Sequence, residues 1–310
     1  MSHNYTLRIS VPSDGLAKYV SDIDNLEVVI WDLEGETPTG DFDIVVPPYL
    51  RPVEQLAALR DVRVRLIQSQ MIGFDGVRPY LPAGSLYANA ASVHETATAE
   101  LTLALILASQ RGLPDFIQRA QAGEWKPDWR PGLADARVLL VGYGGVGRAI
   151  SERLDPFEVE VVRVVSTARG DERGQLHGVD ELPELLPGFD VVIMAVPLLD
   201  STRGMVDDAF LSRMREGSLL VNMARGPVVD TDALVRHVSS GRIRAALDVV
   251  DPEPLPAGHP LYGLPGVLLT PHVGGRSNAM QPRMGKLLRQ QIECLRAGKE
   301  PVNLVFAGES

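Results

Sequence analysis

Short apolar runs alternate with longer helical stretches along most of the chain. The alternation is most regular from Arg137 onward, where helical intervals such as 207–214 and 230–240 lie between runs that are apolar on both faces. Such runs are typical of strands buried in a parallel sheet, because helices cover both of its faces. Six runs fit this description: VLLVG (138–142), VVRVV (161–165), DVVIMAVP (190–197), SLLVNMA (218–224), AALDVV (245–250) and VLLTPHV (267–273). The pattern predicts a doubly wound parallel α/β sheet.

The first ninety residues repeat the alternation with shorter elements, which predicts a smaller α/β layer structure. Its strand-like runs and helical patterns are 7–11, 15–23, 28–32, 44–48, 52–60 and 62–68. Residues 94–112 are apolar on nearly every side and predict a buried helix. Residues 123–136 contain Pro, Gly and Trp and predict a surface connection. A last helical pattern extends from about Asn278 to Ala297.

Length, composition and charge narrow the class of protein. At about 150 residues per domain, 310 residues suggest two domains. Hydrophobic residues make up 45% and charged residues 23%, which fits a folded globular protein. The 30 Lys and Arg residues against 40 Asp and Glu residues give a formal net charge of −10. This charge would repel a phosphate backbone, so we expect no nucleic-acid partner.

Cysteine and histidine usage argues against a metal site and an internal disulfide. Cys294 is the single cysteine, and the six histidines are scattered without the spacing of zinc ligands. The first twelve residues do not have the layout of a signal peptide. The longest apolar run, 101–108, is too short to span a membrane. We therefore expect a cytoplasmic protein with no membrane partner.

A glycine-rich segment, Gly142-Tyr143-Gly144-Gly145-Val146-Gly147, follows the strand at 138–142 and opens a helical pattern. A G-x-G-x-x-G in this context is typical of dinucleotide-binding sheets. Gly142 permits the tight turn, Gly144 lets the backbone approach a pyrophosphate, and Gly147 allows close packing of helix on strand. The helix N-terminus offers N–H groups to the anion. The segment therefore predicts a dinucleotide site.

The next strand ends without an acidic residue, and Ser166, Thr167, Ala168 and Arg169 follow it. A carboxylate at this tip would accept hydrogen bonds from the 2′-hydroxyl of an NAD(H) ribose. The hydroxyls of Ser166 and Thr167 with the cation of Arg169 would instead bind a 2′-phosphate. This favours NADP(H) as the cofactor. The alternative, a solvated Arg169 and use of NAD(H), stays open.

Three further motifs follow later strands at their carboxyl ends, where ligands bind in open α/β sheets. They are Asn222-Met223-Ala224-Arg225-Gly226, Leu247 to Leu255 (LDVVDPEPL), and Thr270 to Gly275 (TPHVGG). Together with the glycine-rich segment, they resemble the D-isomer-specific 2-hydroxyacid dehydrogenase family, whose N-x-x-R-G, D-V-x-x-x-E-P-L and P-H-x-G-G signatures occur in the same order. The resemblance extends from about Arg137 to Gly275, and it is weaker in the first ninety residues.

The resemblance implies hydride transfer between a pyridine nucleotide and a 2-oxo acid, giving a D-2-hydroxy acid. It implies Arg225, Glu253 and His272 as the catalytic residues. Arg225 would present its planar fork to the substrate carboxylate and polarise the adjacent carbonyl. His272 would exchange a proton with the carbonyl oxygen. Glu253 would hydrogen-bond the imidazole and favour its protonated form. Read singly, each of the three is more simply a structural or surface residue.

The resemblance also places further residues beside the cofactor, with Asp248 facing the nicotinamide carboxamide. The others are Gly145, Val146, Val196, Pro197, Met223, Ala224 and the segment from His272 through Gly274 to Gly275. An Asp at the end of a strand that caps the following loop is the alternative for Asp248. In the first ninety residues, Gln68 to Asp75 resembles the loop that holds the substrate carboxylate, with backbone donors at Ile72 and Gly73. Met71 and Ile72 replace the small residues usual there, so the sequence does not set the substrate's size.

The resemblance implies a Rossmann domain, 91–277, inserted into a smaller flavodoxin-like substrate domain made from 1–90 and 278–310. The site is expected between them, in a homodimer. Glyoxylate and hydroxypyruvate are the expected kinds of substrate. Two other functions stay open: an NAD-linked formate or phosphite dehydrogenase on the same scaffold, and a corepressor-like interaction protein that senses the dinucleotide.

Overall fold

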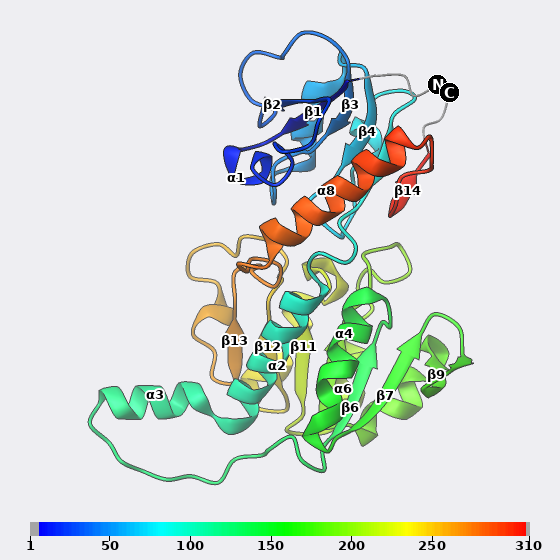
Figure 1. Cartoon of the computed structure of the whole chain (residues 1–310). Helices are drawn as coiled ribbons and strands as arrows, with labels where there is room; N and C mark the ends of the chain where they lie inside the picture. Colours follow the sequence, from blue (N-terminus) through cyan, green and yellow to red (C-terminus); the bar gives the residue numbers. More distant parts are fainter. Residues whose placement is uncertain (1–5, 308–310) are drawn as a thin grey trace. The chain divides into compact units, whose positions relative to one another are not determined.

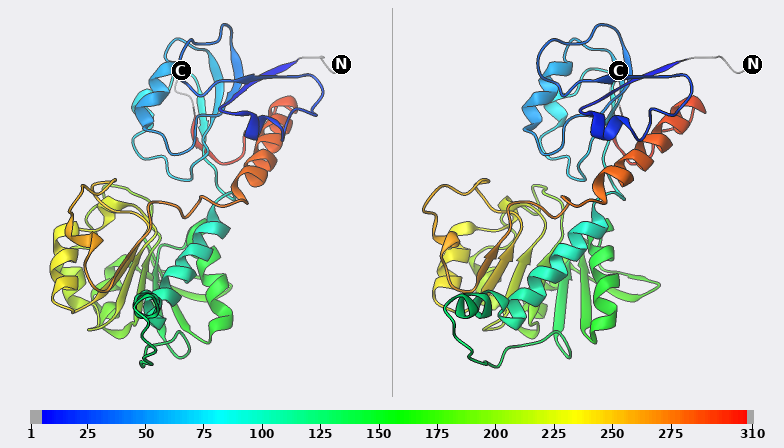
Figure 2. Two further views of the ribbon diagram at one scale, coloured as in Figure 1. Left: turned by 90° about the vertical axis from the view of Figure 1, so that its left-hand side faces the viewer. Right: turned by 60° about the vertical axis from the view of Figure 1, so that its left-hand side comes forward.

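The computed structural model describes residues 6–307 and divides into two compact units (Figures 1 and 2). Unit 1 comprises the described residues up to His94 and those from Ser277 onward, and unit 2 comprises Glu95–Arg276. Unit 2 thus lies in the sequence between the two segments of unit 1. Residues 1–5 and 308–310, which the predicted domain ranges include, lie outside the described residues.

Unit 2 contains an eight-stranded sheet in the order β13-β12-β11-β10-β6-β7-β9-β8. Its strands are β6 Arg137–Val141, β7 Glu160–Val165, β8 Arg169–Asp171, β9 Gly174–Gly178, β10 Val191–Met194, β11 Leu219–Asn222, β12 Arg244–Leu247 and β13 Val267–Leu269. From β6 the chain adds β7, β9 and β8 toward one edge of the sheet, and it then adds β10 to β13 toward the other edge. The direction of strand addition therefore reverses beside β6. Ligands of Rossmann-type sheets bind at such a reversal. The predicted fold class is confirmed.

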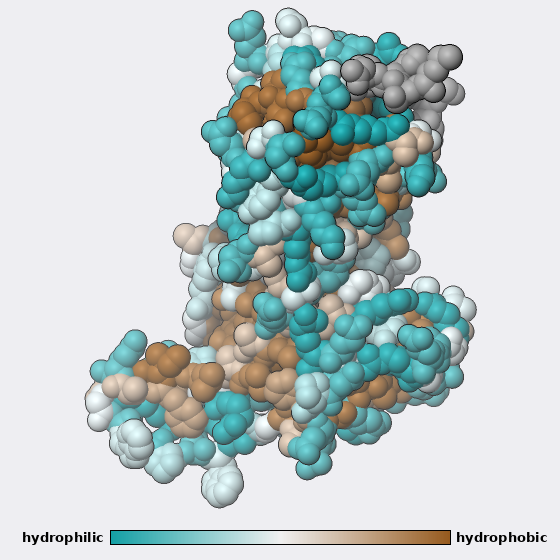
Figure 3. Space-filling model, in the orientation of Figure 1, coloured by the Kyte–Doolittle hydropathy of each residue, from teal (hydrophilic) through white to brown (hydrophobic). Residues whose placement is uncertain are grey.

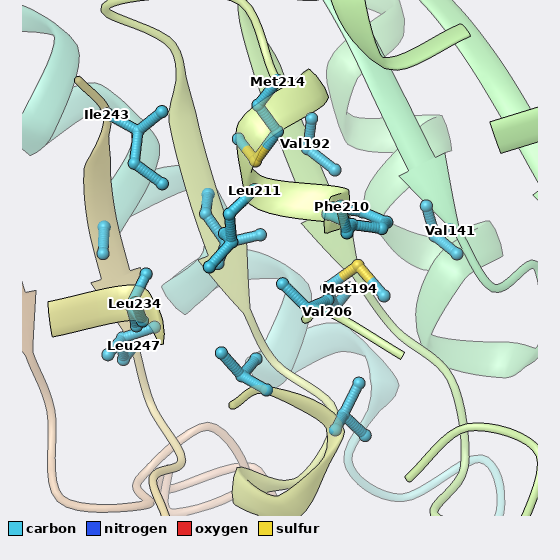
Figure 4. Close-up of a cluster of buried hydrophobic side chains, with 14 of the residues drawn as sticks. Val141, Val192, Met194, Val206, Phe210, Leu211, Met214, Leu234, Ile243 and Leu247 are labelled. Atoms are coloured by element: carbon cyan, nitrogen blue, oxygen red, sulfur yellow. The ribbon is translucent and has the colours of Figure 1, made fainter. Parts of the chain in front are cut away.

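Helices cover both faces of this sheet (Figure 1). They are α2 Glu95–Arg111, α4 Gly145–Leu154, α5 Leu182–Leu185, α6 Asp208–Arg213 and α7 Thr231–Ser239. Helices α2 and α4 pack with Leu140 and Ile193, whereas α6 and α7 pack with Leu139 and Val192. Figure 4 shows part of the core that α6 and α7 form with the sheet. Successive strand residues point to opposite faces, so strands between two helical layers must be apolar at every position.

The sheet has two strands that the apolar pattern does not predict. Strand β9 pairs in parallel with β7, and β8 pairs antiparallel with β9, so the two form a hairpin at the sheet edge. Residues 169–178 are polar, rich in glycine and mostly exposed, so they carry no hydrophobic period. Arg169, expected in the loop after the second strand, is instead the first residue of β8.

Unit 1 contains a six-stranded sheet in the order β14-β5-β4-β3-β1-β2. Its strands are β1 Leu7–Val11, β2 Leu26–Ile30, β3 Phe42–Val45, β4 Val64–Gln68, β5 Leu86–Ala88 and β14 Leu304–Phe306. All pairs are parallel except β14 with β5. The order 2-1-3-4-5 is that of a flavodoxin-like sheet. Helix α8, Met280–Arg296, packs its apolar side chains into a core with Leu7, Ile9 and Leu66.

Two predicted helices of unit 1 are shorter or tighter than their patterns indicate. The pattern at 15–23 yields α1, Asp14–Ala17, followed by turns, and the pattern at 52–60 yields a 3-10 helix, η1 Val53–Leu59. Val20, Ser21 and Asp22 have low helix propensity, which ends α1 early. Strands β5 and β14, three residues each, are too short to give a periodic signal. Other short 3-10 helices are η2 Arg78–Tyr80, η3 Asp155–Phe157, η4 Val179–Glu181, η5 Leu186–Gly188, η6 Gly226–Val228 and η7 Pro260–Tyr262.

Candidate active site

The glycine-rich turn between β6 and α4 has the geometry of a phosphate cradle. Gly142 has φ +101°, and a Cβ there would lie 2.4 Å from the carbonyl oxygen of Ala195. A Cβ at Gly147 would lie 2.1 Å from the carbonyl oxygen of Gly142. A Cβ at Gly144 would meet nothing within 4 Å, and this N-cap residue has no side chain to satisfy the first N–H groups of α4. The turn therefore fits a dinucleotide pyrophosphate.

The segments after β7 and β10 flank this turn. Ser166 and Thr167 are exposed, and Arg169 Nη1 lies 3.5 Å from the carbonyl oxygen of Thr167. Val196 follows β10, and its backbone nitrogen would lie 2.9 Å from a Cβ on Gly142. The carbonyl oxygen of Pro197 accepts a hydrogen bond from the Thr202 hydroxyl at 2.6 Å. Two hydroxyls and a guanidinium thus follow β7, and backbone groups follow β10, the two strands that neighbour β6 and its glycine-rich turn.

The turn after β11 sets the position of Arg225. Asn222, 1% exposed, accepts a hydrogen bond from Ala224 N at 3.0 Å and donates one to the carbonyl oxygen of Arg225 at 3.0 Å. Arg225 Nη1 donates to the carbonyl oxygen of Ala224 at 2.8 Å. A Cβ at Gly226 would lie 1.8 Å from the carbonyl oxygen of Val250, so the segments after β11 and β12 touch here. Asn222 and Gly226 of N-x-x-R-G thus brace the arginine, a role that the sequence does not reveal.

Asp248, at the end of β12, holds the segment that carries His272. Its carboxylate accepts hydrogen bonds from the Thr270 hydroxyl at 2.6 Å, Val273 N at 2.9 Å and Gly274 N at 2.8 Å. Its carbonyl oxygen accepts one from His272 N at 2.8 Å. A carboxylate has about four lone-pair positions, so one position is left for a carboxamide N–H. The observed bonds are those of a carboxylate that caps the following loop, and the contact with a carboxamide stays a prediction.

His272 and Glu253 form a hydrogen-bonded pair. His272 Nδ1 lies 2.5 Å from Glu253 Oε1, and the side chains are 26% and 40% exposed. Since an ionised carboxylate only accepts, Nδ1 carries the proton of this bond and Nε2 is the nitrogen available to a reactant. His272 has φ +51°, an uncommon conformation for a non-glycine residue that costs about 1–2 kcal/mol. The bonds to Asp248 hold it there.

The environment keeps Glu253 ionised. Burial raises the pKa of its carboxyl. The hydrogen bond and charge of His272, the backbone N–H of Val250 and the charge of Arg225 lower the pKa, and together they outweigh burial. The net result is a pKa below the ordinary value. Arg225, Glu253 and His272 therefore lie within electrostatic reach of one another, and the geometry combines an anion-binding fork with a proton-transfer pair.

In unit 1, side chains fix the segment after β4 that contains Ile72 and Gly73. Met71 N donates to the Ser69 hydroxyl at 3.0 Å, and Asn89 Nδ2 donates to the carbonyl oxygen of Ile72 at 2.9 Å. Buried His94 lies with Nε2 2.6 Å from the carbonyl oxygen of Gln70. These bonds orient the backbone whose N–H groups are the predicted carboxylate donors. Asn89 and His94 belong to none of the sequence motifs, so no local pattern identifies them as site residues.

Among residues 6–307, no group of three or more His, Cys, Asp or Glu side chains could hold a metal ion. Within the same range, none of the helices combines the length and apolar character needed to cross a membrane.

Known proteins resemble the chain over most of its length. A family model described as "D-isomer specific 2-hydroxyacid dehydrogenase, NAD binding domain" matches residues 103–274. A glyoxylate reductase of Pyrococcus furiosus is 30% identical over 96% of this chain and 93% of its own. The human glyoxylate reductase/hydroxypyruvate reductase is 35% identical over 63% of this chain and 62% of its own. A crystal structure from Xanthobacter autotrophicus, a D-isomer-specific 2-hydroxyacid dehydrogenase with NADPH and MES, has a TM-score of 0.83 at 26% identity and covers 98% of each chain.

Proposed function

Because the chain belongs to the D-isomer-specific 2-hydroxyacid dehydrogenase family, oxidoreductases that use a nicotinamide dinucleotide, we propose that it reduces a small 2-oxo acid to a D-2-hydroxy acid. Acids of the glyoxylate and hydroxypyruvate type are the favoured substrates, since relatives are named for reducing them. The observation that carries the proposal is the 2.5 Å pair of His272 and Glu253 at the carboxyl ends of the strands, within the electrostatic reach of Arg225.

Each of the three side chains has one task in this reaction. Arg225 binds the substrate carboxylate with its fork and draws electron density from the adjacent carbonyl. The dinucleotide, when bound, supplies a hydride to the carbonyl carbon. His272 donates the Nε2 proton to the carbonyl oxygen, so that the alcohol leaves neutral, and Glu253 stabilises the imidazolium before the transfer. In the reverse direction His272 Nε2 takes the proton back.

The chain's own residues hold the dinucleotide at the reversal beside β6. We assign this role to Gly142, Gly144, Gly145, Val146, Gly147, Val196, Pro197, Met223, Ala224, Asp248, Gly274 and Gly275. The wide space beside Gly144 and the remaining lone-pair position of Asp248 support the assignment. Ile72 and Gly73 are proposed to bind the substrate carboxylate through backbone N–H groups.

NADP(H) is the favoured cofactor. The exposed hydroxyls of Ser166 and Thr167 and the guanidinium of Arg169 suit a 2′-phosphate, and a structural relative binds NADPH. A fluorescence titration with NADPH and NADH tests this preference. Binding of NADH as tight as that of NADPH contradicts it.

We also propose a homodimer and an element that forms its interface. Helix α3, Leu113–Gln121, has no buried residue, and Figure 3 shows hydrophobic side chains over it. Trp125 and Trp129 in the following loop are 100% and 99% exposed, and Leu113 and Ile117 are 47% and 58% exposed. Large contiguous apolar surface is rare on monomers. A second copy of the chain would cover it, and sedimentation of W125S/W129S as a monomer against a wild-type dimer would support this.

The cytoplasmic location stays a prediction.

A steady-state assay tests the proposed reaction. Loss of reduced-nicotinamide absorbance is followed with NADPH and NADH separately, against acids from glyoxylate and hydroxypyruvate to branched and aromatic 2-oxo acids, with formate in the oxidative direction. Turnover of a 2-oxo acid with formation of the D-alcohol supports the proposal. Oxidation of formate without reduction of any 2-oxo acid would replace it. Dinucleotide binding without any turnover would favour a sensor function.

A further inference from the structure

A buried arginine connects the glycine-rich turn to the β8–β9 hairpin. Arg163 lies in β7, and its side chain is 8% exposed. Its guanidinium carbon lies 5.1 Å from the ring centroid of Tyr143, and Nη1 donates to the Tyr143 hydroxyl at 3.3 Å. Tyr143 belongs to the glycine-rich turn, so one end of this arrangement is the proposed pyrophosphate site.

The other contacts of Arg163 reach the hairpin. Nη1 lies 3.3 Å from Asp171 Oδ1, and Nη2 donates to the carbonyl oxygens of Arg173 at 2.6 Å and Gln175 at 3.4 Å. Asp171, Arg173 and Gln175 lie at the end of β8, in the turn and in β9. The hairpin buries little apolar surface, since only Leu176 and Gly178 of residues 169–178 are buried. Besides the pairing of β9 with β7 and the ion pair of Arg173 with Asp155, polar contacts to one guanidinium therefore fix it.

This hairpin begins where the cofactor's adenosine ribose would lie. Arg169 is the first residue of β8, and the exposed Ser166 and Thr167 immediately precede it. A lysine at position 163 would keep the charge but present a single ammonium in place of the planar fork, so it could not satisfy acceptors in both segments. The placement of Ser166, Thr167 and Arg169 relative to the turn thus depends on an arginine whose side chain is only 8% exposed.

We propose that Arg163 is a positioning residue for cofactor selectivity: by joining Tyr143 to the β8–β9 hairpin, it sets how well the site distinguishes a 2′-phosphate from a 2′-hydroxyl. This rests on the proposed dinucleotide site and on its preference for NADP(H). The side chain itself touches neither group and acts through the backbone that it holds.

The test compares two charge-conserving substitutions in the same strand pair. Arg137 in β6 donates to both carboxylate oxygens of Glu160 at 2.9 Å and to the carbonyl oxygen of Gly188, at the amino end of β7. R163K and R137K therefore each replace a fork by an ammonium, but only R163K lies next to the hairpin. Dissociation constants for NADPH and NADH are measured by fluorescence titration, and amide hydrogen exchange is measured on the protein without dinucleotide.

We expect R163K to weaken NADPH binding about tenfold more than NADH binding, and to speed exchange in residues 169–178. R137K should leave the preference for NADPH over NADH and the exchange of residues 169–178 unchanged, even if it lowers Tm. This preference is the ratio of the NADH dissociation constant to the NADPH dissociation constant. If R163K does not fold, Y143F, which removes only the phenol hydroxyl, should reduce this ratio by a smaller factor. An unchanged ratio in a folded R163K, or in Y143F when R163K does not fold, overturns the inference. Failure of the wild type to bind either dinucleotide overturns the proposed function instead.

Discussion

The two units hold their candidate site residues in different ways. In unit 2, contacts between the ends of neighbouring strands of one sheet set the geometry: Gly226 approaches the carbonyl of Val250, and the Asp248 carboxylate accepts from the N–H groups of Val273 and Gly274. In unit 1, side chains far apart in the sequence fix the 69–73 segment, and Gln68 is itself held by Gln291 at 2.6 Å across 223 residues. The proposed proton-transfer pair lies in unit 2 and the proposed backbone donors Ile72 and Gly73 lie in unit 1. We therefore expect loss of His272 to lower kcat, and loss of the contacts that fix the 69–73 segment to raise KM.

The largest effect is expected for His272. H272A removes the proposed proton donor, so kcat should fall about 100- to 10,000-fold while the dissociation constant of the dinucleotide stays near the wild-type value. Stopped-flow and steady-state assays measure the first, and fluorescence titration the second. The control is H237A, which removes a histidine outside the site, with a side chain 12% exposed and 3.3 Å from Asp208. Near-normal kcat in a folded H272A would rule out this role.

A smaller effect is expected for the fork of Arg225. R225K keeps the charge but loses bidentate geometry, so kcat/KM for the 2-oxo acid should fall about 100-fold, which corresponds to about 2.7 kcal/mol. R236K, on the exposed pair with Asp208, is the matched control. An equal loss in the two variants would show that Arg225 does not bind the substrate.

A change in unit 1 should separate affinity from chemistry. N89A removes the donor to the carbonyl oxygen of Ile72, so KM for the 2-oxo acid should rise about 5- to 10-fold, the equivalent of one hydrogen bond, with little change in kcat. Q55A, which removes an amide that binds the carbonyl oxygen of Asp32 in the same unit, should leave KM unchanged. A fall in kcat alone would contradict the contrast between the units.

The smallest effect concerns the pH dependence of stability. The pKa of Glu253 lies below its ordinary value of 4.5, so the ionised carboxylate stabilises the fold above that pH, and the contribution is lost as the pH falls through the folded-state pKa. E253Q should therefore lower Tm modestly at pH 7, and the difference should shrink below pH 4.5. A difference that grows toward acid, measured by calorimetry, would reverse the assigned sign.

Sequence patterns reveal those parts of the molecule that carry a period or a motif. Hydrophobic spacing predicts the six apolar strands of unit 2 and the buried helix at 94–112. The G-x-G-x-x-G motif predicts the tight turn that requires Gly142 and Gly147. Arg163 interrupts an apolar strand without any local signal, because its partners lie in a polar hairpin and in the turn before α4. Asn89 and His94 act through backbone carbonyls of residues 17 or more positions away, a relation that no local spacing encodes. The roles of the motif residues themselves stay predictions.

The interruption of unit 1 by unit 2 has a consequence for synthesis on the ribosome. Strand β14 pairs with β5, and helix α8 completes the core around Leu7 and Ile9, yet both are translated only after all of unit 2. Unit 2 is continuous and can close its core as soon as it emerges, whereas β5 must wait as an open sheet edge. The nascent chain therefore exposes an unpaired strand of unit 1 for the time needed to translate more than 200 residues, from Ala88 to Leu304.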